Sequence, residues 1–310
     1  MSRIIHLVDS IEYATSNCFQ KQLTKALQKL PNVVTVPLAE LSVVDGDRVV
    51  CCLKQRTLFN RLEMLAIRLQ QTPVRIYDQD PWHSYMDDSP FKGVYELATQ
   101  RLNVETIAVT SQWWVDRIRR SGMHSSFVPM WISADLCSSE KTFIDREIDV
   151  GFIGSLHLYR HNLFEFLESA GLHVDVSGGN HRDHNTYLQE LRNIAIYVRT
   201  EDGPIQVNGE RLNLRDGLWG RDIEVASQGC FSIRNRGQGH ESYLSNLPVG
   251  DDGQSVVRLF DQKEEIPSIV EGIQKMDVQV RQSLIDRTVE YIKGSDRWQE
   301  TATTLTTFNS

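Results

Sequence analysis

The chain has few of the features that mark disulfide-rich or membrane-spanning proteins. Its 310 residues include five cysteines, an odd number with no Cys-x-x-Cys pair, which argues against a disulfide framework or a zinc knuckle. No apolar run approaches the about 20 residues that cross a bilayer, and the opening segment MSRIIHLVDS lacks the apolar core of a signal peptide. These absences predict a soluble, cytoplasmic protein with at most peripheral membrane association.

Positive charge is also scarce. The formal net charge is −8, so a broad electropositive face is not expected, and we predict no nucleic-acid partner. A local basic pocket for a small anion is compatible with this balance. The sequence contains neither a Walker A loop nor a Gly-x-Ser-x-Gly elbow, so neither P-loop nor α/β-hydrolase chemistry is indicated.

What the sequence does contain is a regular alternation of short β-branched runs and amphipathic segments. We expect strands at 3–8, 33–38, 48–53, 73–78, 106–111 and 125–131, and then, after a polar stretch at 133–147, at 148–154, 172–179, 194–200 and 230–235. Helical patterns at 17–30, 58–71, 94–102, 112–122, 161–171, 185–193, 264–276 and 278–294 separate or follow them. This alternation predicts an α/β protein with two doubly wound parallel sheets.

The polar stretch at 133–147 is interpreted as a linker between the two sheets. It divides the chain into an N-terminal domain at 1–140 and a C-terminal domain at 141–280. Residues 281–310 are predicted as a C-terminal helix, ending near Trp298, that either crosses back onto the first domain or lies on the surface. Ligands of open α/β sheets bind beyond the carboxyl ends of the strands, so we expect a site in a cleft between the domains.

One candidate strand end carries a glycine followed by a serine and a nearby arginine. Gly154 would let the backbone approach a ligand closely, and the free amides after it, beginning at Ser155, would favour an anion at the following helix. Arg160 would add a fixed positive charge. The alternative is an ordinary strand-to-helix turn.

The stretch LRDGLWGRDIEVASQG places two acids around a glycine-rich loop. We interpret RDIEVASQG as a helix stopped by Gly229, with Glu224 in its early turns and Asp216 in the loop before it. A carboxylate can accept hydrogen bonds from the two neighbouring hydroxyls of a ribose. The alternatives are a surface acid near a helix start for Glu224 and a turn residue for Asp216.

These motifs resemble those of nucleotide-sugar glycosyltransferases with the GT-B fold, most closely the family-four group and its spore-maturation glycosyltransferase-like branch. That motif is an acid, Gly-aromatic-Gly, and then Glu-Ala-x-Ala-x-Gly. The sequence here reads Asp216-Gly217-Leu218-Trp219-Gly220 and then Glu224-Val225-Ala226-Ser227-Gln228-Gly229, with the family's seven residues between the acids. The resemblance covers about residues 148–275.

The resemblance implies two Rossmann-like domains facing a cleft and a nucleotide-diphospho-sugar as substrate, with no further cofactor and no metal. It implies that Glu224 binds the ribose and that Asp216 contacts the transferred sugar, with the loop from Gly217 to Gly220, including Leu218 and Trp219, positioning it. Gly154 and Arg160 match the family's diphosphate-binding glycine and second basic position, whereas Ser155 replaces the first basic residue. The implied setting is polysaccharide or glycan assembly, with a glycan, lipid-linked or small-molecule acceptor.

The N-terminal half would hold the acceptor. Asp78, Asp80 and His83 follow a predicted strand within the segment RIYDQDPWHSY, where one of them would orient or deprotonate the acceptor hydroxyl. The alternative is a turn whose acids bond their own backbone.

Two other functions stay open from the sequence. Asp78 and Asp80 form an Asp-x-Asp pair of the kind that binds a divalent cation in the GT-A glycosyltransferase fold. The chain is also compatible with a binding protein that closes on a nucleotide or sugar without turning it over. We interpret the segment SGGNHRDHN, with His181 and His184, as a solvated loop rather than a metal site.

Overall fold

The computed structural model describes residues 3–16, 18–178, 183–201, 203–213, 220–295 and 297–308. The chain folds into two compact units. Unit 1 comprises Met1–Met130, Ile205–Leu212 and Arg297–Ser310, and unit 2 comprises Trp131–Pro204 and Asn213–Asp296. The chain therefore passes from one unit to the other four times, at residues 130/131, 204/205, 212/213 and 296/297.

Unit 1 is built on a parallel six-stranded sheet with the order β2-β1-β3-β4-β5-β6. Its strands are β1 (Ile4–Val8), β2 (Val33–Pro37), β3 (Arg48–Cys51), β4 (Val74–Asp78), β5 (Val104–Val109) and β6 (Ser125–Phe127). The central strands are almost wholly buried, as expected where helices cover both faces of a parallel sheet.

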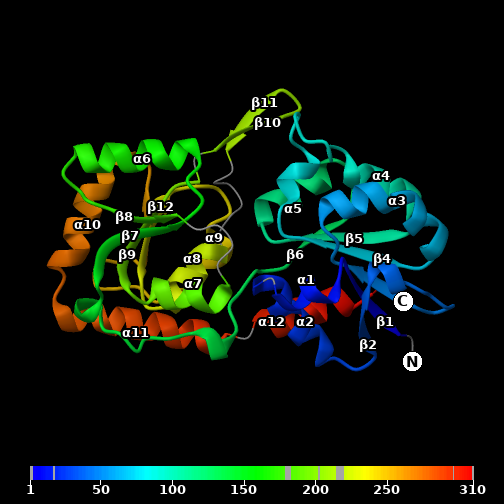
Figure 1. The fold of residues 1–310 in the computed structure, drawn as a ribbon, viewed down its shortest axis with the longest axis horizontal. Coiled ribbons are helices and arrows are strands. Elements are labelled where there is room, and N and C mark those ends of the chain that lie inside the picture. The colour runs from blue at the N-terminus through cyan, green and yellow to red at the C-terminus, as the bar shows by residue number, and fades with distance from the viewer. Residues whose placement is uncertain are drawn as a thin grey trace. The chain divides into compact units, whose positions relative to one another are not determined.

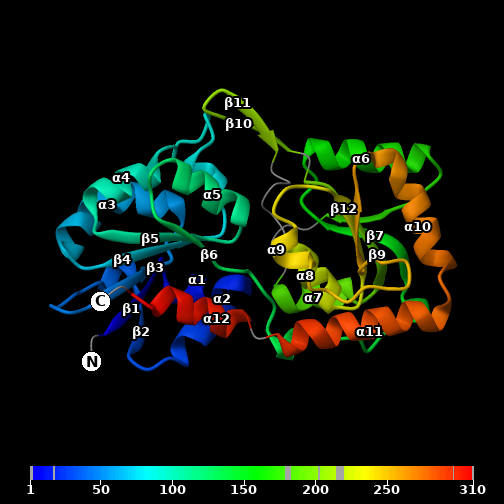
Figure 2. The ribbon, with the colours of Figure 1, turned by 180° about the vertical axis from the view of Figure 1, so that it is seen from behind.

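The helices of unit 1 lie on both faces of this sheet (Figures 1 and 2). They are α1 (Ile11–Ser16), α2 (Cys18–Gln28), α3 (Gln55–Leu69), α4 (Val94–Arg101), α5 (Gln112–Arg120) and α12 (Arg297–Thr306), with 3-10 turns η1 (Leu38–Glu40) and η2 (Pro81–Ser84). In both views α3, α4 and α5 lie on one face, and α1, α2 and α12 on the other. In α3 the buried residues Leu58, Leu62, Leu65 and Leu69 recur every three or four positions, which gives the helix one apolar face.

A short hairpin, β10 (Pro204–Val207) and β11 (Glu210–Asn213), also belongs to unit 1 and has no counterpart in the sequence analysis. Asn208 and Gly209 form its turn, both with positive φ, as a type I′ hairpin turn requires. The Asp87 carboxylate accepts hydrogen bonds from both of their backbone N–H groups at 2.9 Å. These contacts attach the hairpin to the segment that follows η2.

Unit 2 is built on a parallel five-stranded sheet with the order β13-β12-β9-β7-β8. Its strands are β7 (Ile148–Gly154), β8 (Asp175–Gly178), β9 (Ile194–Arg199), β12 (Phe231–Asn235) and β13 (Val257–Phe260). When the strands are numbered within each unit, the order is 2-1-3-4-5-6 in unit 1 and 2-1-3-4-5 in unit 2. In unit 2 the strand order therefore reverses between β7 and β9. The predicted α/β class with two Rossmann-like sheets is therefore confirmed.

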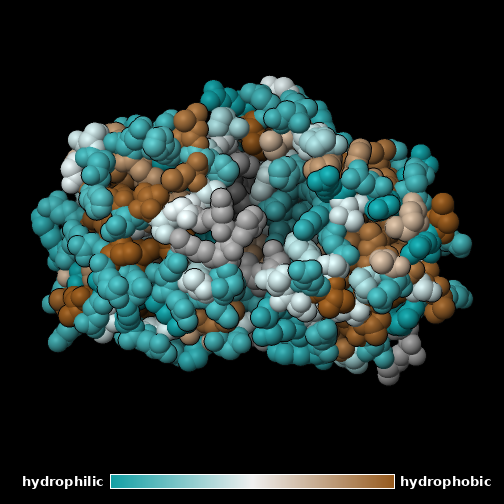
Figure 3. Space-filling model, in the orientation of Figure 1, coloured by the Kyte–Doolittle hydropathy of each residue, from teal (hydrophilic) through white to brown (hydrophobic). Residues whose placement is uncertain are grey.

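The helices of unit 2 are α6 (Leu158–Ser169), α7 (His184–Leu191), α8 (Gly220–Ser227), α9 (Glu241–Leu244), α10 (Ile266–Lys275) and α11 (Val278–Gly294), with 3-10 turns η3 (Ala134–Leu136), η4 (Phe143–Asp145) and η5 (Lys263–Glu265). In both ribbon views α6 lies on one face of the sheet, and α7, α8 and α11 lie on the other. On the face drawn in Figure 3, hydrophilic residues predominate and the hydrophobic ones form separate patches.

Three details differ from the sequence analysis. Helix α11 ends at Gly294, and the segment with Trp298 is a separate helix, α12, which packs on α2 of unit 1. The stretch 133–147 is part of unit 2 rather than a linker, because the buried Arg146 donates hydrogen bonds to the carbonyls of Ile194 and Gln228. The sequence analysis also did not predict strand β13 and helix α1, because they are short, with four and six residues.

Candidate functional site

The carboxyl end of β7 carries the glycine that the sequence analysis selected. Gly154 has a φ of +156°, and a Cβ added there would lie 2.9 Å from Cζ of the buried Phe152 ring. Both facts favour glycine at this position. The neighbouring strand β9 braces this end of β7, because the Tyr197 hydroxyl donates to the carbonyl of Ile153 at 2.8 Å.

Arg160, in the first turn of α6, joins the loops that follow β7 and β9. Its Nη1 donates to the carbonyl of Ser155 at 2.8 Å, and its Nε donates to the carbonyl of Thr200 at 3.2 Å. Its Nη2 lies 2.7 Å and 2.8 Å from the two carboxylate oxygens of Glu201. Ser155 itself is exposed. The structure therefore brings Gly154, Ser155 and Arg160 together at the point where the strand order reverses.

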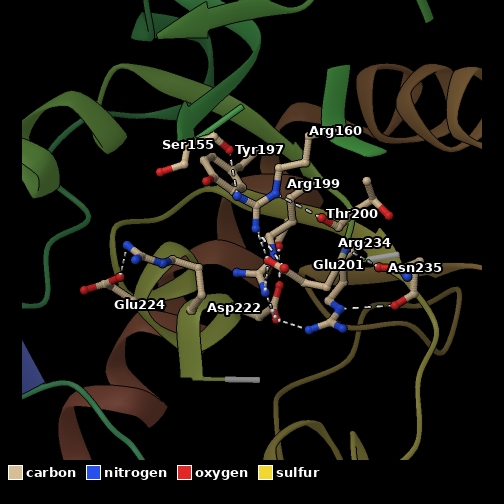
Figure 4. A network of polar contacts seen from close by, with 12 residues as sticks. Ser155, Arg160, Tyr197, Arg199, Thr200, Glu201, Asp222, Glu224, Arg234 and Asn235 are labelled. Atoms are coloured by element: carbon tan, nitrogen blue, oxygen red, sulfur yellow. Dashed lines mark hydrogen bonds and ion pairs between the residues drawn. The ribbon is translucent and has the colours of Figure 1, made fainter. Parts of the chain in front are cut away.

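A network of buried charges extends from Arg160 across the ends of β9 and β12 (Figure 4). Arg199 Nη2 lies 3.0 Å from Glu201 Oε1 and 4.0 Å from Asp222 Oδ2, and Arg234 Nη1 donates to Asp222 Oδ2 at 3.0 Å. Among the described residues, this network joins three arginines and two carboxylates. Arginines gathered at the carboxyl edge of a sheet favour an anionic ligand.

The arginines of the network favour the charged form of Glu201. Burial alone would raise the pKa of Glu201, but the charges of Arg199 and Arg160 lower it below its ordinary value. Burial likewise works against the charge of Arg199, and the carboxylates of Asp222 and Glu201 raise its pKa. The cluster is thus a set of mutually compensating charges rather than neutral polar groups.

Helix α8 places Glu224 beside a second set of polar side chains. Glu224 is 1 % exposed, and its Oε1 lies 2.7 Å from His184 Nε2 of α7. Its Oε2 accepts a hydrogen bond from Arg221 Nη1 at 2.8 Å. Burial alone would raise the pKa of Glu224, but the charge of Arg221 and the hydrogen bond from His184 lower it. Glu224 is therefore a buried carboxylate and not the surface acid of the alternative interpretation.

The glycine-rich loop before α8 is only partly described. Asp216, Gly217, Leu218 and Trp219 lie outside the described residues, so their predicted roles stay predictions. Gly220 is the first residue of α8 and is buried.

In unit 1 the three predicted residues at the end of β4 have different surroundings. Asp78 is held on both oxygens: Oδ2 accepts from the Tyr95 hydroxyl at 2.7 Å and from the Gln55 amide, and Oδ1 accepts from the Asp80 N–H at 2.8 Å. Asp80 and His83 are exposed. These contacts indicate a structural task for Asp78 and leave Asp80 and His83 available to a ligand.

The pKa of Asp80 is raised to about 7, by loss of hydration and by the neighbouring Asp78 carboxylate. A carboxyl group with this pKa exchanges protons near neutral pH, as a general base does.

Several residues of unit 2 escaped the sequence analysis. Arg199 is the last residue of β9 and Glu201 lies two residues beyond it, so the strand-end rule could have selected both. Asp222 and Arg234 are fully buried, and nothing in the sequence marks these two charged residues as buried. His184 was interpreted as part of a solvated loop, and this is wrong: it begins α7 and contacts Glu224.

The described residues contain neither a cluster of metal-ligating side chains nor a helix that could span a membrane. Nowhere among them do three His, Cys, Asp or Glu side chains come together as the ligands of a metal ion would. None of the helices in the described part of the chain has the length and apolar character that crossing a lipid bilayer requires.

Comparison with known proteins gave matches among solved structures alone: no family model and no curated protein matches the chain. An alpha-glucosyltransferase in complex with UDP-glucose and DNA containing an abasic site matches with a TM-score of 0.61 at 11% identity. An alpha-glucosyltransferase in complex with UDP and a 13-mer DNA containing an HMU base matches with a TM-score of 0.64 at 12% identity. Each match covers 99% of this chain and 100% of the other. AviGT4, a glycosyltransferase involved in avilamycin A biosynthesis, matches with a TM-score of 0.49 at 11% identity over 98% of both chains. The chain thus has the two-unit α/β fold, GT-B, of solved nucleotide-sugar glycosyltransferases.

Proposed function

We propose that the chain is a glycosyltransferase that moves a sugar from a nucleotide-diphospho-sugar to a hydroxyl acceptor. The observation that carries this proposal is the pairing of two features at one edge of unit 2. An arginine cluster lies at the ends of β7 and β9, and the buried Glu224 carboxylate lies on α8. A diphosphate and a ribose are the two groups that such a pair would recognise.

In this proposal the bond between the sugar C1 and the diphosphate oxygen breaks, and a bond from C1 to the acceptor oxygen forms. Arg160, Arg199 and the amides after Gly154 stabilise the charge that grows on the departing diphosphate. Glu224 binds the ribose. Asp216 and the loop from Gly217 to Gly220 position the sugar. Asp80 or His83 of unit 1 takes the acceptor proton, with Asp78 fixing the turn that carries them.

The proposed donor is the ligand of two solved glucosyltransferase structures with TM-scores of 0.61 and 0.64, which contain UDP-glucose and UDP. We propose a family-four-like enzyme that needs no metal, because arginines supply the positive charge that a cation would supply to the diphosphate. A GT-A enzyme using Asp78 and Asp80 is not favoured, because the chain has two parallel-sheet units and Asp78 is held by Tyr95 and Gln55.

For the acceptor we propose a glycan, a lipid-linked sugar or a small molecule. Polyanionic acceptors are disfavoured by the net charge of −8, by Asp78 at the end of β4, and by Asp80, Asp87 and Asp88 in the segment after it. DNA is the second candidate, because two solved neighbours, with TM-scores of 0.61 and 0.64, contain it. Release of UDP from UDP-glucose, measured with DNA carrying an HMU base and with glycan acceptors, decides between them.

The central test is a thermal-shift and calorimetric panel of UDP, ADP, GDP and their sugar derivatives, with and without a chelator. A bound nucleotide raises the melting temperature by mass action. We expect one diphosphate to stabilise the protein without added metal, and Glu224→Gln, which keeps the size of the side chain, to remove most of that shift. Glu271→Gln, at an exposed acid of α10, is the matched control. Equal nucleotide affinity in Glu224→Gln and in the unaltered protein would contradict the proposal.

A proposal that includes turnover also needs a transfer assay. Free nucleoside diphosphate should accumulate only when donor and acceptor are both present. Nucleotide binding without release of the diphosphate, over a broad acceptor panel, would favour the non-catalytic binding protein instead.

A further inference from the structure

Both oxygens of the Glu224 carboxylate are engaged by side chains from its own unit. One accepts from His184 Nε2 at 2.7 Å and the other from Arg221 Nη1 at 2.8 Å. A carboxylate offers about four lone-pair sites, so these two donors leave room for two more hydrogen bonds. The two donors therefore fix the plane of the carboxylate without occupying it fully.

His184 must be the donor in its contact. Glu224 is ionised, since its pKa lies below the ordinary value, and a carboxylate only accepts. The proton of this hydrogen bond therefore belongs to Nε2 of the imidazole, in either the neutral or the charged form of the ring. The contact does not depend on protonation of the second nitrogen.

The surroundings hold His184 in place. Asp183 caps α7 by accepting from the backbone N–H groups of Asn185 at 3.0 Å and Thr186 at 3.1 Å. The His184 ring lies parallel to the ring of Tyr187, with an interplanar angle of 15° and centroids 6.3 Å apart. The guanidinium of Arg221 lies 4.7 Å from the centroid of the same Tyr187 ring. One buried aromatic ring thus supports both of the donors that hold Glu224.

The two donors differ in their exposure to solvent. The His184 side chain is 15% exposed, whereas that of Arg221 is 40% exposed. His184 is thus the more buried of the two donors, and its contact with the carboxylate lies further from solvent.

From these contacts we propose that His184 is a positioning residue of the donor site: its Nε2–H fixes the Glu224 carboxylate in the orientation that receives the two neighbouring hydroxyls of the ribose. The inference rests on the proposed function, since it requires Glu224 to bind a ribose. Under this proposal, His184 affects the recognition of the ribose hydroxyls and not the recognition of the phosphates.

The test measures, by calorimetry, the affinity of UDP and of 2′,3′-dideoxy-UDP for the full chain, with the ADP and GDP pairs run alongside. Because the two ligands differ only in the ribose hydroxyls, the ratio of their affinities measures the contribution of these hydroxyls alone. We expect His184→Ala to reduce this ratio by about tenfold, the size of a hydrogen bond to a charged group. His184→Gln, whose amide still donates, should restore most of it, and His161→Ala on α6 should leave it unchanged. In a Glu224→Ala background His184→Ala should have no further effect.

The outcomes separate the inference from the proposed function. If no nucleotide binds, or if Glu224→Ala leaves the ratio unchanged, the proposed function fails and the inference fails with it. If Glu224→Ala abolishes the ratio but His184→Ala does not change it, the inference alone is overturned. Equal loss of both ligands in His184→Ala and His184→Gln would show that His184 only packs, which overturns the inference as well.

Discussion

The carboxylate of Asp222 lies 3.0 Å from the guanidinium of Arg234, and both side chains are completely buried. Asp222 also accepts from the Ser232 hydroxyl at 2.9 Å. The pair therefore ties α8, which carries Glu224, to β12 of the sheet. A buried ion pair of this kind holds its helix in one position, although both charged groups lose their hydration on folding.

Breaking this pair should destabilise the protein strongly. Asp222→Asn leaves the charge of Arg234 buried without its main partner, and we expect the free energy of unfolding to fall by about 3–5 kcal/mol. Urea unfolding followed by circular dichroism measures the change. Asp261→Asn, which disrupts the exposed pair with Arg236, should change it by less than about 1 kcal/mol. Similar values for the two variants would refute the role assigned to Asp222.

Arg160 should recognise phosphate rather than the nucleoside. Replacing it with alanine removes a donor of charge-assisted hydrogen bonds, so UDP affinity should fall by roughly tenfold or more. The affinity of uridine should stay the same, and isothermal titration calorimetry can measure both. Arg236→Ala, at a half-exposed arginine outside the cluster, serves as the control. Equal losses of affinity for UDP and for uridine would mean that Arg160 supports the fold of unit 2 and does not bind phosphate.

The proposed base predicts a definite pH dependence. A carboxyl group with a raised pKa keeps its proton below that pKa, so Asp80 is available as a base only above about pH 7. The value of kcat/KM should therefore rise as the pH passes through 7 and then level off. Asp80→Asn should remove this rise and lower kcat/KM by about 10²–10⁴-fold. If Asp80→Asn keeps the same pH profile of kcat/KM, the general base is His83 or a residue outside this segment.

Gly154 should tolerate no side chain. Gly154→Ala combines a φ of +156° with a contact of 2.9 Å to the Phe152 ring, and we expect a loss of about 1–3 kcal/mol in unfolding free energy. Gly178→Ala, at the end of β8, is the matched control, because a Cβ there would meet no atom within 4 Å. Thermal unfolding of the two variants makes the comparison. If both unfold at the same temperature, Gly154 is not needed for the backbone conformation.

The sheets and most helices were predictable because their signals are local. Runs such as IIHLV in β1 and IAIYVR in β9 show strand character within a few residues, and α3 shows its apolar spacing within fifteen residues. The hairpin β10–β11 was missed because its strands are short and partly exposed, although Asn208 and Gly209 mark its turn. α12 was missed as a separate helix because its packing partner α2 lies far away in the sequence.

The candidate site divides in the same way. Gly154, Arg160 and Glu224 were selected from motifs with fixed short spacing. His184 lies 40 residues before Glu224, and Arg160 lies 41 residues before Glu201, so no local pattern connects the members of either pair. Asp222 and Arg234 looked like ordinary charged residues, because a sequence does not show that a charge is buried beside its partner.

The sequence by itself determined the α/β alternation, the two doubly wound sheets and the glycine and acid motifs, since each depends on residues within one or two elements. The tertiary structure decided which charges face one another: Arg160 and Arg199 with Glu201, His184 with Glu224, and Asp222 with Arg234. The physical reason is that an ion pair depends on distance in space. That distance is fixed only when parallel strands bring the ends of β7, β9 and β12 to the same edge of the sheet.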